Sequence, residues 1–226
     1  MNYKNITQLL KNYFFILHTF KNIFLYKNKM NVTEYLKEKG FIDFEGYSAQ
    51  NNDEVELLKK LLNEKTIRNI LEIGFNAGHS SEIFLESVND IHVTSFDMGI
   101  HTYVKVAKKY IDNKYPNRHK LIYGDSRITL PEYIESYPDK KFDLIFIDGG
   151  HFNDVPQKDL FNCKFLSHAD TIVIMDDTMN NPEHINPWNI MPNKAWRDDI
   201  ENKNIKEIAT FEFSKTHGLS YGKYIF

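Results

Sequence analysis

The chain has 226 residues, of which 42% are hydrophobic, and this length suits one α/β domain with a sizeable core. The net charge of −3 excludes the basic surface of a typical nucleic-acid-binding protein, so we expect no nucleic-acid partner. Cys163, the single cysteine, excludes an internal disulfide framework and fits a reducing compartment, which favours a cytoplasmic location.

Residues 1–30 have the pattern of a basic amphipathic helix. Apolar side chains recur at helical spacing from Ile6 to Phe24, lysines occupy other positions, and the first acidic residue is Glu34. The apolar runs are too short for a membrane span, and signal-peptide cleavage chemistry is missing. We expect this N-terminal extension to pack against its own domain or a partner subunit, in a homo-oligomer. Contact with a membrane surface is the less favoured alternative.

The predicted domain spans residues 31–226 and begins with helices at 31–39 and 53–63. Residues 69–81 follow as a buried strand, a glycine-containing turn and the start of a helix. Gly74 allows a sharp turn and a close approach by a ligand, because it has no Cβ. The helix that starts near Gly78 directs unpaired N–H groups to the same place. The pattern indicates a cofactor-binding turn, although the glycines of an ordinary strand–turn–helix would look similar.

The turn does not fit a dinucleotide well. A dinucleotide fingerprint has a middle glycine that leaves room for a pyrophosphate next to the backbone, and this chain has Asn76 at that position. A dinucleotide-dependent oxidoreductase is therefore kept only as an alternative.

Two further strands end in polar residues that suit a nucleoside. The strand at 91–96 ends at Asp97 and Met98, where a carboxylate could accept two hydrogen bonds from a ribose diol and a thioether could lie against adenine. The strand at 121–123 leads to Asp125 and Ser126, which could contact adenine, cap the next helix, or do both. An ordinary turn is the alternative for Asp97.

The most apolar strands of the chain, at 142–147 and 171–175, lead to Asp148 and to Asp176–Asp177. Neighbouring parallel strands bring their carboxyl ends to one edge of a sheet. Because carboxylates repel one another there, a divalent cation such as Mg²⁺ is the simplest stabilising partner. Three simpler alternatives remain. Asp148 could serve a metal-free enzyme, His151 could cap a helix, and the acidic pair could form a solvated turn.

The remaining elements complete an α/β pattern. Residues 180–193 carry three prolines and are predicted to be a loop over the site, with Pro182, Trp188 and Trp196 as candidates for a substrate wall. The other predictions are helices at 80–88, 103–115, 127–137 and 195–201, and a C-terminal antiparallel hairpin of 205–213 and 219–226.

These motifs resemble those of the class I S-adenosylmethionine-dependent O-methyltransferases of the metal-dependent, catechol O-methyltransferase-like type. Within that type, the chain is most similar to the branch with macrocin-type sugar O-methyltransferases and cephalosporin-hydroxylase-like proteins. The first motif lies at 71–78 and includes Glu72, Gly74, Asn76 and Gly78; the other matching segments are 96–97, 146–152, 159–160 and 175–177. The resemblance implies a Rossmann-like, mostly parallel seven-stranded sheet with helices on both faces and S-adenosylmethionine as cofactor.

The resemblance also implies a mechanism. Asp148, Asp176 and Asp177 would hold Mg²⁺, and His151 would act as general base on a hydroxyl of a small molecule such as a sugar, a glycan precursor or another polyol or phenol. The catechol enzymes place lysine at position 151 and commonly asparagine at 177, so catechol is not carried over as the substrate. The remaining alternative is a non-catalytic protein that acts through residues 1–30.

Overall fold

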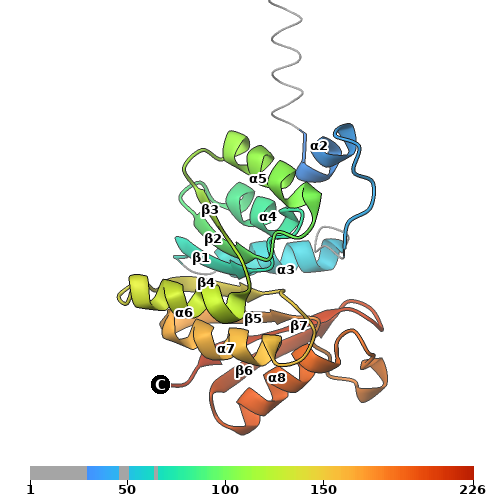
Figure 1. Cartoon of the computed structure of the whole chain (residues 1–226). Coiled ribbons are helices and arrows are strands. Elements are labelled where there is room, and N and C mark those ends of the chain that lie inside the picture. Colours follow the sequence, from blue (N-terminus) through green and yellow to red (C-terminus); the bar gives the residue numbers. More distant parts are fainter. Residues whose placement is uncertain (1–29, 46–50, 64–65) are drawn as a thin grey trace, which may run out of the picture.

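The computed structural model describes residues 30–45, 51–63 and 66–226 (Figure 1). The predicted N-terminal helix therefore lies outside the described residues, apart from the buried side chain of Met30. No helix in the described ranges is both long and apolar enough to span a membrane.

The described residues form one seven-stranded sheet with the order β3-β2-β1-β4-β5-β7-β6. Strands β1 to β5 are parallel, whereas β7 is antiparallel to both β5 and β6. The strands are β1 (Asn69–Ile73), β2 (His92–Asp97), β3 (His119–Tyr123), β4 (Phe142–Ile147), β5 (Ser167–Asp176), β6 (Ile205–Glu212) and β7 (Gly218–Tyr224). This is the Rossmann-like, mostly parallel fold with a C-terminal antiparallel hairpin that the sequence predicts.

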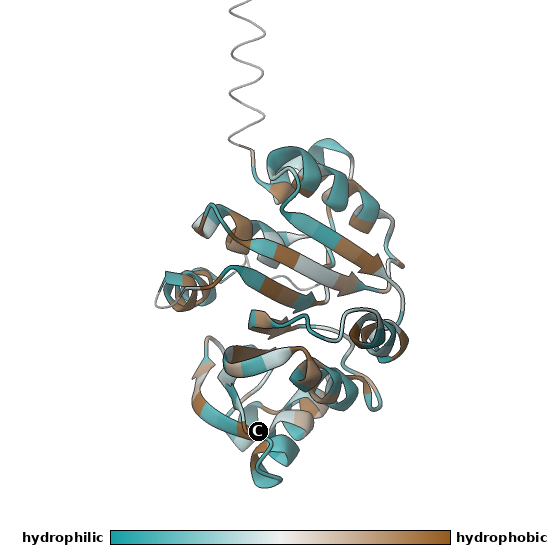
Figure 2. Cartoon of the chain, turned by 90° about the vertical axis from the view of Figure 1, so that its left-hand side faces the viewer, coloured by the Kyte–Doolittle hydropathy of each residue, from teal (hydrophilic) through white to brown (hydrophobic). Residues whose placement is uncertain are grey.

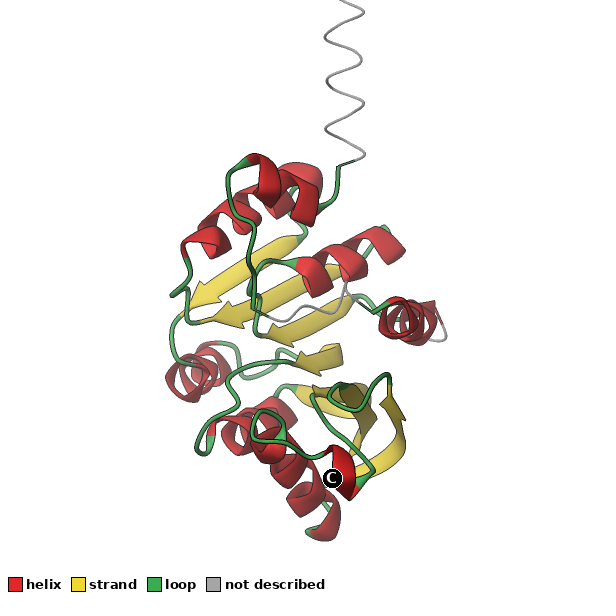
Figure 3. Ribbon diagram, turned by 90° about the vertical axis from the view of Figure 1, so that its right-hand side faces the viewer, coloured by secondary structure: helices red, strands yellow, loops and turns green. Residues whose placement is uncertain are grey.

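Helices cover both faces of the sheet (Figures 1 and 3). One layer contains α2 (Val32–Glu38), α3 (Asn52–Asn63), α4 (His79–Ser87) and α5 (Thr102–Lys114), and the other contains α6 (Ser126–Ser136), α7 (Val155–Phe165) and α8 (Ile190–Glu201).

The central strands are apolar because they face a hydrophobic core on each side. Along β4, Leu144 and Phe146 pack into the core under α2–α5, whereas Ile145 and Ile147 pack into the core under α6–α8. Figure 2 shows hydrophobic segments within the strands and hydrophilic ones on the outer sides of the helices. The near-continuous apolar run of β4 is the consequence of burial on both faces.

The region after β5 differs from the prediction. A short 3₁₀ helix, η2 (Pro182–His184), lies in the predicted loop, and α8 begins at Ile190, five residues before the predicted start. Pro192 does not prevent this, because the first turn of a helix has N–H groups without intrahelical acceptors. Residues 190–193 are therefore helical, and the true loop is shorter.

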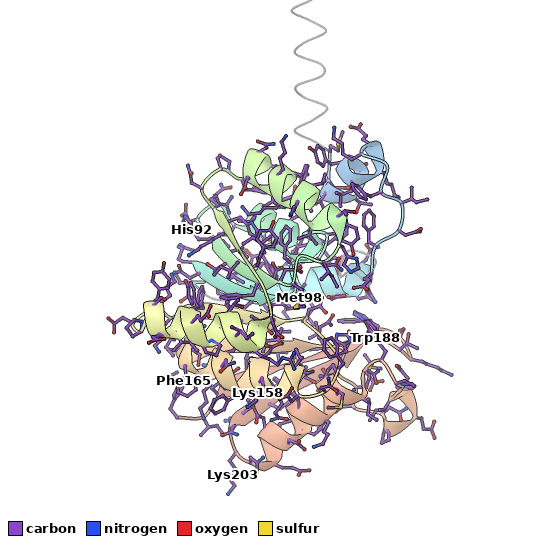
Figure 4. The ribbon with its side chains drawn as sticks, viewed as in Figure 1. His92, Met98, Lys158, Phe165, Trp188 and Lys203 are labelled. Carbon is purple, nitrogen blue, oxygen red and sulfur yellow. The ribbon has the colours of Figure 1, made fainter. Side chains whose placement is uncertain are left out.

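The topology places the ends of several strands at one edge of the sheet. The carboxyl ends of β1, β2, β4 and β5 meet there because these strands run in the same direction. The start of β7 joins them, since β7 runs the opposite way and Leu219 pairs with Asp176. In Figure 4, His92 marks the start of β2 and Met98 lies just after its end, on the same side of the sheet as Trp188.

Candidate active site

The turn after β1 is joined to the end of β4. Gly74 has a φ of 95°, and a Cβ at this position would lie 1.8 Å from the carbonyl oxygen of Asp148. Its N–H donates to the carbonyl of Phe96, and the N–H of Asp148 donates to the carbonyl of Ile73. Glycine is required at position 74 because the backbone of Asp148 approaches it. The atoms that approach Gly74 in this structure belong to the backbone of Asp148 and Gly149, and the close approach of a ligand stays a prediction.

The rest of the turn leads directly into α4. Asn76 has a φ of 48°, and Gly78 has a φ of 79° at the N-cap of the helix. The side chain of Asn76 donates to the carbonyl of Glu45, a residue of the segment before α3. The helix N-terminus therefore opens at the carboxyl edge of the sheet, as predicted.

Glu72 has buried partners. It is fully buried in β1 and accepts hydrogen bonds from the hydroxyls of Ser80, Ser81 and Ser95. Burial raises the pKa of its carboxyl group above the ordinary value, against the effect of these hydroxyls. In this structure Glu72 joins β1, α4 and β2. Glu72 therefore supports the Gly74 turn by joining these elements rather than by offering an exposed carboxylate.

Asp97 connects two turns at the cofactor side. One carboxylate oxygen accepts from the N–H of Asn76 at 2.7 Å, and the other accepts from the N–H of Gly99 at 2.6 Å. Each oxygen keeps acceptor capacity for a further donor. Met98 follows with 53% of its surface exposed, and Ile100 is 70% exposed. A carboxylate beside exposed apolar side chains suits a ribose and an adenine ring.

Asp125 and Ser126 have roles of their own at the start of α6. Asp125 is the N-cap and forms an ion pair with Arg127, with Nη2 2.7 Å from Oδ2. Ser126 is the first residue of α6, near Asp159 of α7, a buried carboxyl whose pKa burial raises to about 7 against a smaller opposing effect of Ser126. The capping interpretation of Asp125 is confirmed, and any contact with a cofactor would be additional.

Asp148, His151 and Asp177 come together after β4 and β5. One ligand atom from each lies within 4.8 Å of the other two. His151 Nε2 is 3.3 Å from Asp177 Oδ2, and both side chains are about 10% exposed. Asp177 has a φ of 54°, so the chain turns sharply between Asp176 and Asp177.

Asp176 belongs to a neighbouring group with two residues that the sequence analysis did not select. Glu54 of α3 and His217, just before β7, each place a ligand atom within 4.8 Å of Asp176 and of each other. His217 Nε2 is 2.8 Å from Glu54 Oε2, and its Nδ1 is 3.7 Å from Asp177 Oδ1. The structure therefore brings the three predicted aspartates to one edge, with His151 beside Asp148 and Asp177, and His217 beside Asp176 and Asp177.

These carboxylates affect one another strongly. Burial raises the pKa of Asp148 well above its ordinary value, and the charges of Asp176 and then Asp177 raise it further. Burial and the charge of Asp177 raise the pKa of Asp176 in the same way. Protonation or a bound cation would relieve this repulsion.

The two histidines respond in opposite ways. Burial lowers the pKa of His151, although Asp177 opposes that effect. Burial would also lower the pKa of His217, but hydrogen bonds to Asp177 and Glu54 outweigh it and raise the pKa to about 11. Near pH 7 His151 is thus neutral and able to accept a proton, whereas His217 is charged.

The loop after β5 forms a wall beside His151. Trp188 is 56% exposed, and its ring centroid lies 4.4 Å from that of His151 with the rings steeply inclined. Backbone N–H groups of Asn180 and Asn181 donate to Glu212, which holds the loop against β6.

Trp196 is not part of this wall, contrary to the prediction. It is fully buried on the inner face of α8, and its indole Nε1–H donates to Glu207 at 2.6 Å. Its position on the inner face of the longer α8 explains the difference, because residues 190–194 are helical rather than loop.

The sequence contains signals for Glu54 and His217. Glu54 shares one helical face with Leu58 and Leu61, so it is a charged residue on an otherwise buried stripe. His217 lies in the predicted hairpin turn, and only the antiparallel pairing of β7 with β5 brings it beside Asp176.

The donor set fits a divalent cation. Asp176 Oδ1 and Glu54 Oε1 are buried without a hydrogen-bond partner among the described residues, and four carboxylates converge on two imidazoles. Oxygen-rich groups of this kind are typical ligands for Mg²⁺ or Mn²⁺.

Comparisons with known proteins agree with this fold. Residues 71–178 match the family model described as "Methyltransferase domain". No curated protein sequence gives a significant match.

Solved structures with the same fold include O-methyltransferases. A putative caffeoyl-CoA O-methyltransferase from Staphylococcus aureus has a TM-score of 0.65 and 21% identity over 92% of this chain and 99% of that one. An O-methyltransferase from Bacillus cereus in complex with SAH has a TM-score of 0.67 and 19% identity over 85% and 90%. A TDP-rhamnose 3′-O-methyltransferase of calicheamicin biosynthesis has a TM-score of 0.57 and 18% identity over 75% and 76%. Residues 71–178 are therefore similar to the methyltransferase-domain family, and the chain has the fold of these solved O-methyltransferases.

Proposed function

We propose that this protein transfers a methyl group from S-adenosylmethionine to a hydroxyl group of a small molecule, with the help of a divalent cation. The observation that carries the proposal is the convergence of Asp148, Asp177 and His151 at the edge of the sheet that also holds the Gly74 turn. A cation-binding group and a neutral imidazole beside a cofactor turn are the parts that methyl transfer to a hydroxyl requires.

The cofactor would lie along the turns after β1, β2 and β3. Asp97 would accept hydrogen bonds from the ribose hydroxyls, and Met98 would lie against the adenine ring. N–H groups at the start of α4 would face the carboxylate of the cofactor. Glu72 would act indirectly, because its three serine partners fix the helix against β1 and β2. When bound, S-adenosylmethionine supplies the electrophilic methyl group.

The aspartates would hold the cation, which would lower the pKa of a hydroxyl group bound to it. Asp148 and Asp177 contribute from the ends of β4 and β5, and Asp176 is near enough to raise the pKa of Asp148. Their mutual repulsion is reduced when positive charge lies between them.

His151 would take the proton of the acceptor hydroxyl. Its Nε2 lies 3.3 Å from Asp177 Oδ2, so an imidazolium formed in the reaction would have an anionic partner. Trp188 packs against the ring and limits its movement, and its exposed surface offers an apolar wall to the acceptor. Aromatic walls suit the CH faces of sugars as well as flat rings. We therefore propose a sugar, a glycan precursor or another polyol or phenol as the acceptor.

Cofactor class is tested by calorimetric titration of the full chain with S-adenosylhomocysteine and with NAD. We expect micromolar binding of S-adenosylhomocysteine, on the order of 1–100 μM, and no NAD binding at concentrations a hundredfold higher. Binding of NAD alone would contradict the proposal and favour the oxidoreductase.

Methyl transfer is tested with isotopically labelled S-adenosylmethionine and a panel of sugar, nucleotide-sugar and phenolic acceptors. With the best acceptor, Asp148→Asn and His151→Gln should each lower the rate about 10²- to 10⁴-fold, with the affinity for S-adenosylhomocysteine changed less than about threefold. Asp139→Asn is the matched control, because this exposed residue precedes β4 at the opposite edge of the sheet. Full activity of Asp148→Asn in the presence of a chelator would exclude a role for the cation.

A further inference from the structure

The group formed by Glu54, Asp176 and His217 is distinct from the one just described. Its members come from the start of α3, the end of β5 and the residue before β7, and one ligand atom of each lies within 4.8 Å of the others. The group of Asp148, His151 and Asp177 contains none of these three residues, although Asp176 is also one of the aspartates proposed to hold its cation. The proposed methyl transfer does not require Glu54 or His217. The two groups are neighbours, since His217 Nδ1 lies 3.7 Å from Asp177 Oδ1.

The buried acids of this group keep two oxygens without a hydrogen-bond partner among the described residues, even with the charged imidazole of His217 beside them. Glu54 is fully buried and Asp176 is 5% exposed. One oxygen of each, Glu54 Oε1 and Asp176 Oδ1, has no hydrogen-bond partner in the described part of the chain. A buried carboxylate oxygen without a partner is costly, because it loses its hydration and gains nothing in return. His217 contacts the other oxygen of Glu54, so the ion pair does not account for these two oxygens.

The surrounding structure fixes the three ligands in place. A Cβ on Gly218 would lie 2.6 Å from the carbonyl oxygen of Phe211 and 2.7 Å from that of Thr178. The N–H of Thr178 donates to the carbonyl of Gly218 at 3.1 Å. His217 is thereby held against the end of β5 by backbone contacts on both sides, and Glu54 is held by the buried face of α3.

We propose that Glu54, Asp176 and His217 form a second divalent-cation site beside the Asp148 site. Each site then has two carboxylates and one imidazole within reach, and Asp176 lies close to both. An imidazole among carboxylates favours Mn²⁺, Fe²⁺ or Zn²⁺ over Mg²⁺, which prefers oxygen ligands and retains its waters. The protein would bind two cations at adjacent positions when Mn²⁺ is supplied, and the imidazole of His217 would release its proton to solvent as the second cation binds.

The test is the binding of Mn²⁺ to the full chain after treatment with a chelator, followed by calorimetry and by electron paramagnetic resonance. We expect two equivalents of Mn²⁺ and a spectrum broadened by magnetic coupling between neighbouring ions. Glu54→Gln and His217→Gln should each remove one equivalent, or weaken it on the order of 100-fold, and give the spectrum of an isolated ion.

Matched controls are available on the same elements. Glu56→Gln changes an exposed acid of α3, and His92→Gln changes an exposed histidine at the opposite edge of the sheet (Figure 4). Both should keep two equivalents. Because Glu54→Gln could fold poorly, its circular dichroism spectrum and melting temperature are compared with those of His217→Gln, and either variant alone suffices for the test.

One equivalent in the wild-type protein would overturn the proposal, as would two equivalents that both variants retain. Either result can occur in an active methyltransferase, so it leaves the proposed function standing. With Mg²⁺ alone we expect a single equivalent that Asp148→Asn removes, and a second Mg²⁺ lost in Glu54→Gln would contradict the preference for the softer ions.

Discussion

Single residues in this site have partners that the linear sequence only partly shows. Asp148, Asp176 and Asp177 could be selected from sequence because each follows an apolar strand, and the structure brings them to one edge. Their division into two groups could not be predicted, because it depends on the turn at Asp177 and on the approach of His217. The partner of Gly74 was also hidden, since a glycine that allows close approach does not reveal which atoms approach it.

The buried polar cluster around Glu72 gives the protein a sensitivity to acid. Ser95 and Ser81 contact Nε2 of His119 in this cluster, and burial, with a smaller effect of Lys108, lowers the pKa of His119 to about 3. The unfolded chain takes up this proton below about pH 6.5, but the folded protein does not. Stability from this group is therefore present above pH 6.5 and is lost as the pH falls toward 3.

The prediction is tested with His119→Gln, which keeps a hydrogen-bonding group but cannot be protonated. Between about pH 6 and pH 4, the free energy of unfolding of the wild-type protein should fall more steeply than that of the variant, by about 1.4 kcal/mol per pH unit. Urea unfolding at several pH values measures both slopes. His92→Gln, at an exposed position, should keep the wild-type slope. Equal slopes for the wild type and His119→Gln would contradict this role.

Asp159 should have the opposite effect on stability. Burial raises its pKa to about 7 from an ordinary value near 3.8, so the folded protein keeps a proton that the unfolded chain releases. The folded state is penalised progressively as the pH rises from about 4 to about 7. Asp159→Asn should therefore stabilise the protein at pH 8 by roughly 2–4 kcal/mol and should change it little near pH 4.5. An equal effect at both pH values, measured by urea unfolding, would show that the charge is not responsible.

At the scale of elements, hydrophobic periodicity was sufficient to place the strands and most helices. The apolar runs of β4 and β5 and the alternation of the C-terminal hairpin are visible in sequence because each strand faces a core on one or both sides. The start of α8 was missed because three prolines in 180–193 suggested a loop, although Pro192 lies in a first turn where proline is tolerated. Glu54 was missed because the apolar face of α3 does not reveal which element packs against the first turn of that helix.

The junction between β5 and β7 should tolerate little change. Gly218→Ala would place a methyl group 2.6–2.7 Å from two backbone carbonyl oxygens, so the strands must separate or the turn must shift. We expect a loss of about 1–3 kcal/mol in the free energy of unfolding. Lys215→Ala, in the exposed part of the same hairpin turn, serves as the control and should change stability by less than about 0.5 kcal/mol. A fully stable Gly218→Ala protein would contradict the tight packing of this junction.

For the whole molecule, the direction of the strands decides where chemistry can occur. Parallel β1, β2, β4 and β5 bring the Gly74 turn, Asp97 and the aspartates to one edge, and antiparallel β7 brings His217 to the same edge. Helix α3 contributes Glu54 to this edge, and the segment after β5 contributes Trp188. The fold class and the location of the site follow from the order of strands and motifs, whereas the complete set of side chains requires the three-dimensional packing.

The most direct measurement is a crystal structure of the full chain with S-adenosylhomocysteine and Mn²⁺, with the ions located by anomalous scattering. The account predicts the ribose on Asp97, and an ion roughly 2.0–2.6 Å from carboxylate oxygens of Asp148 and Asp177. S-adenosylhomocysteine bound away from the Gly74 turn, or an Asp148 carboxylate without an ion at saturating Mn²⁺, would contradict it.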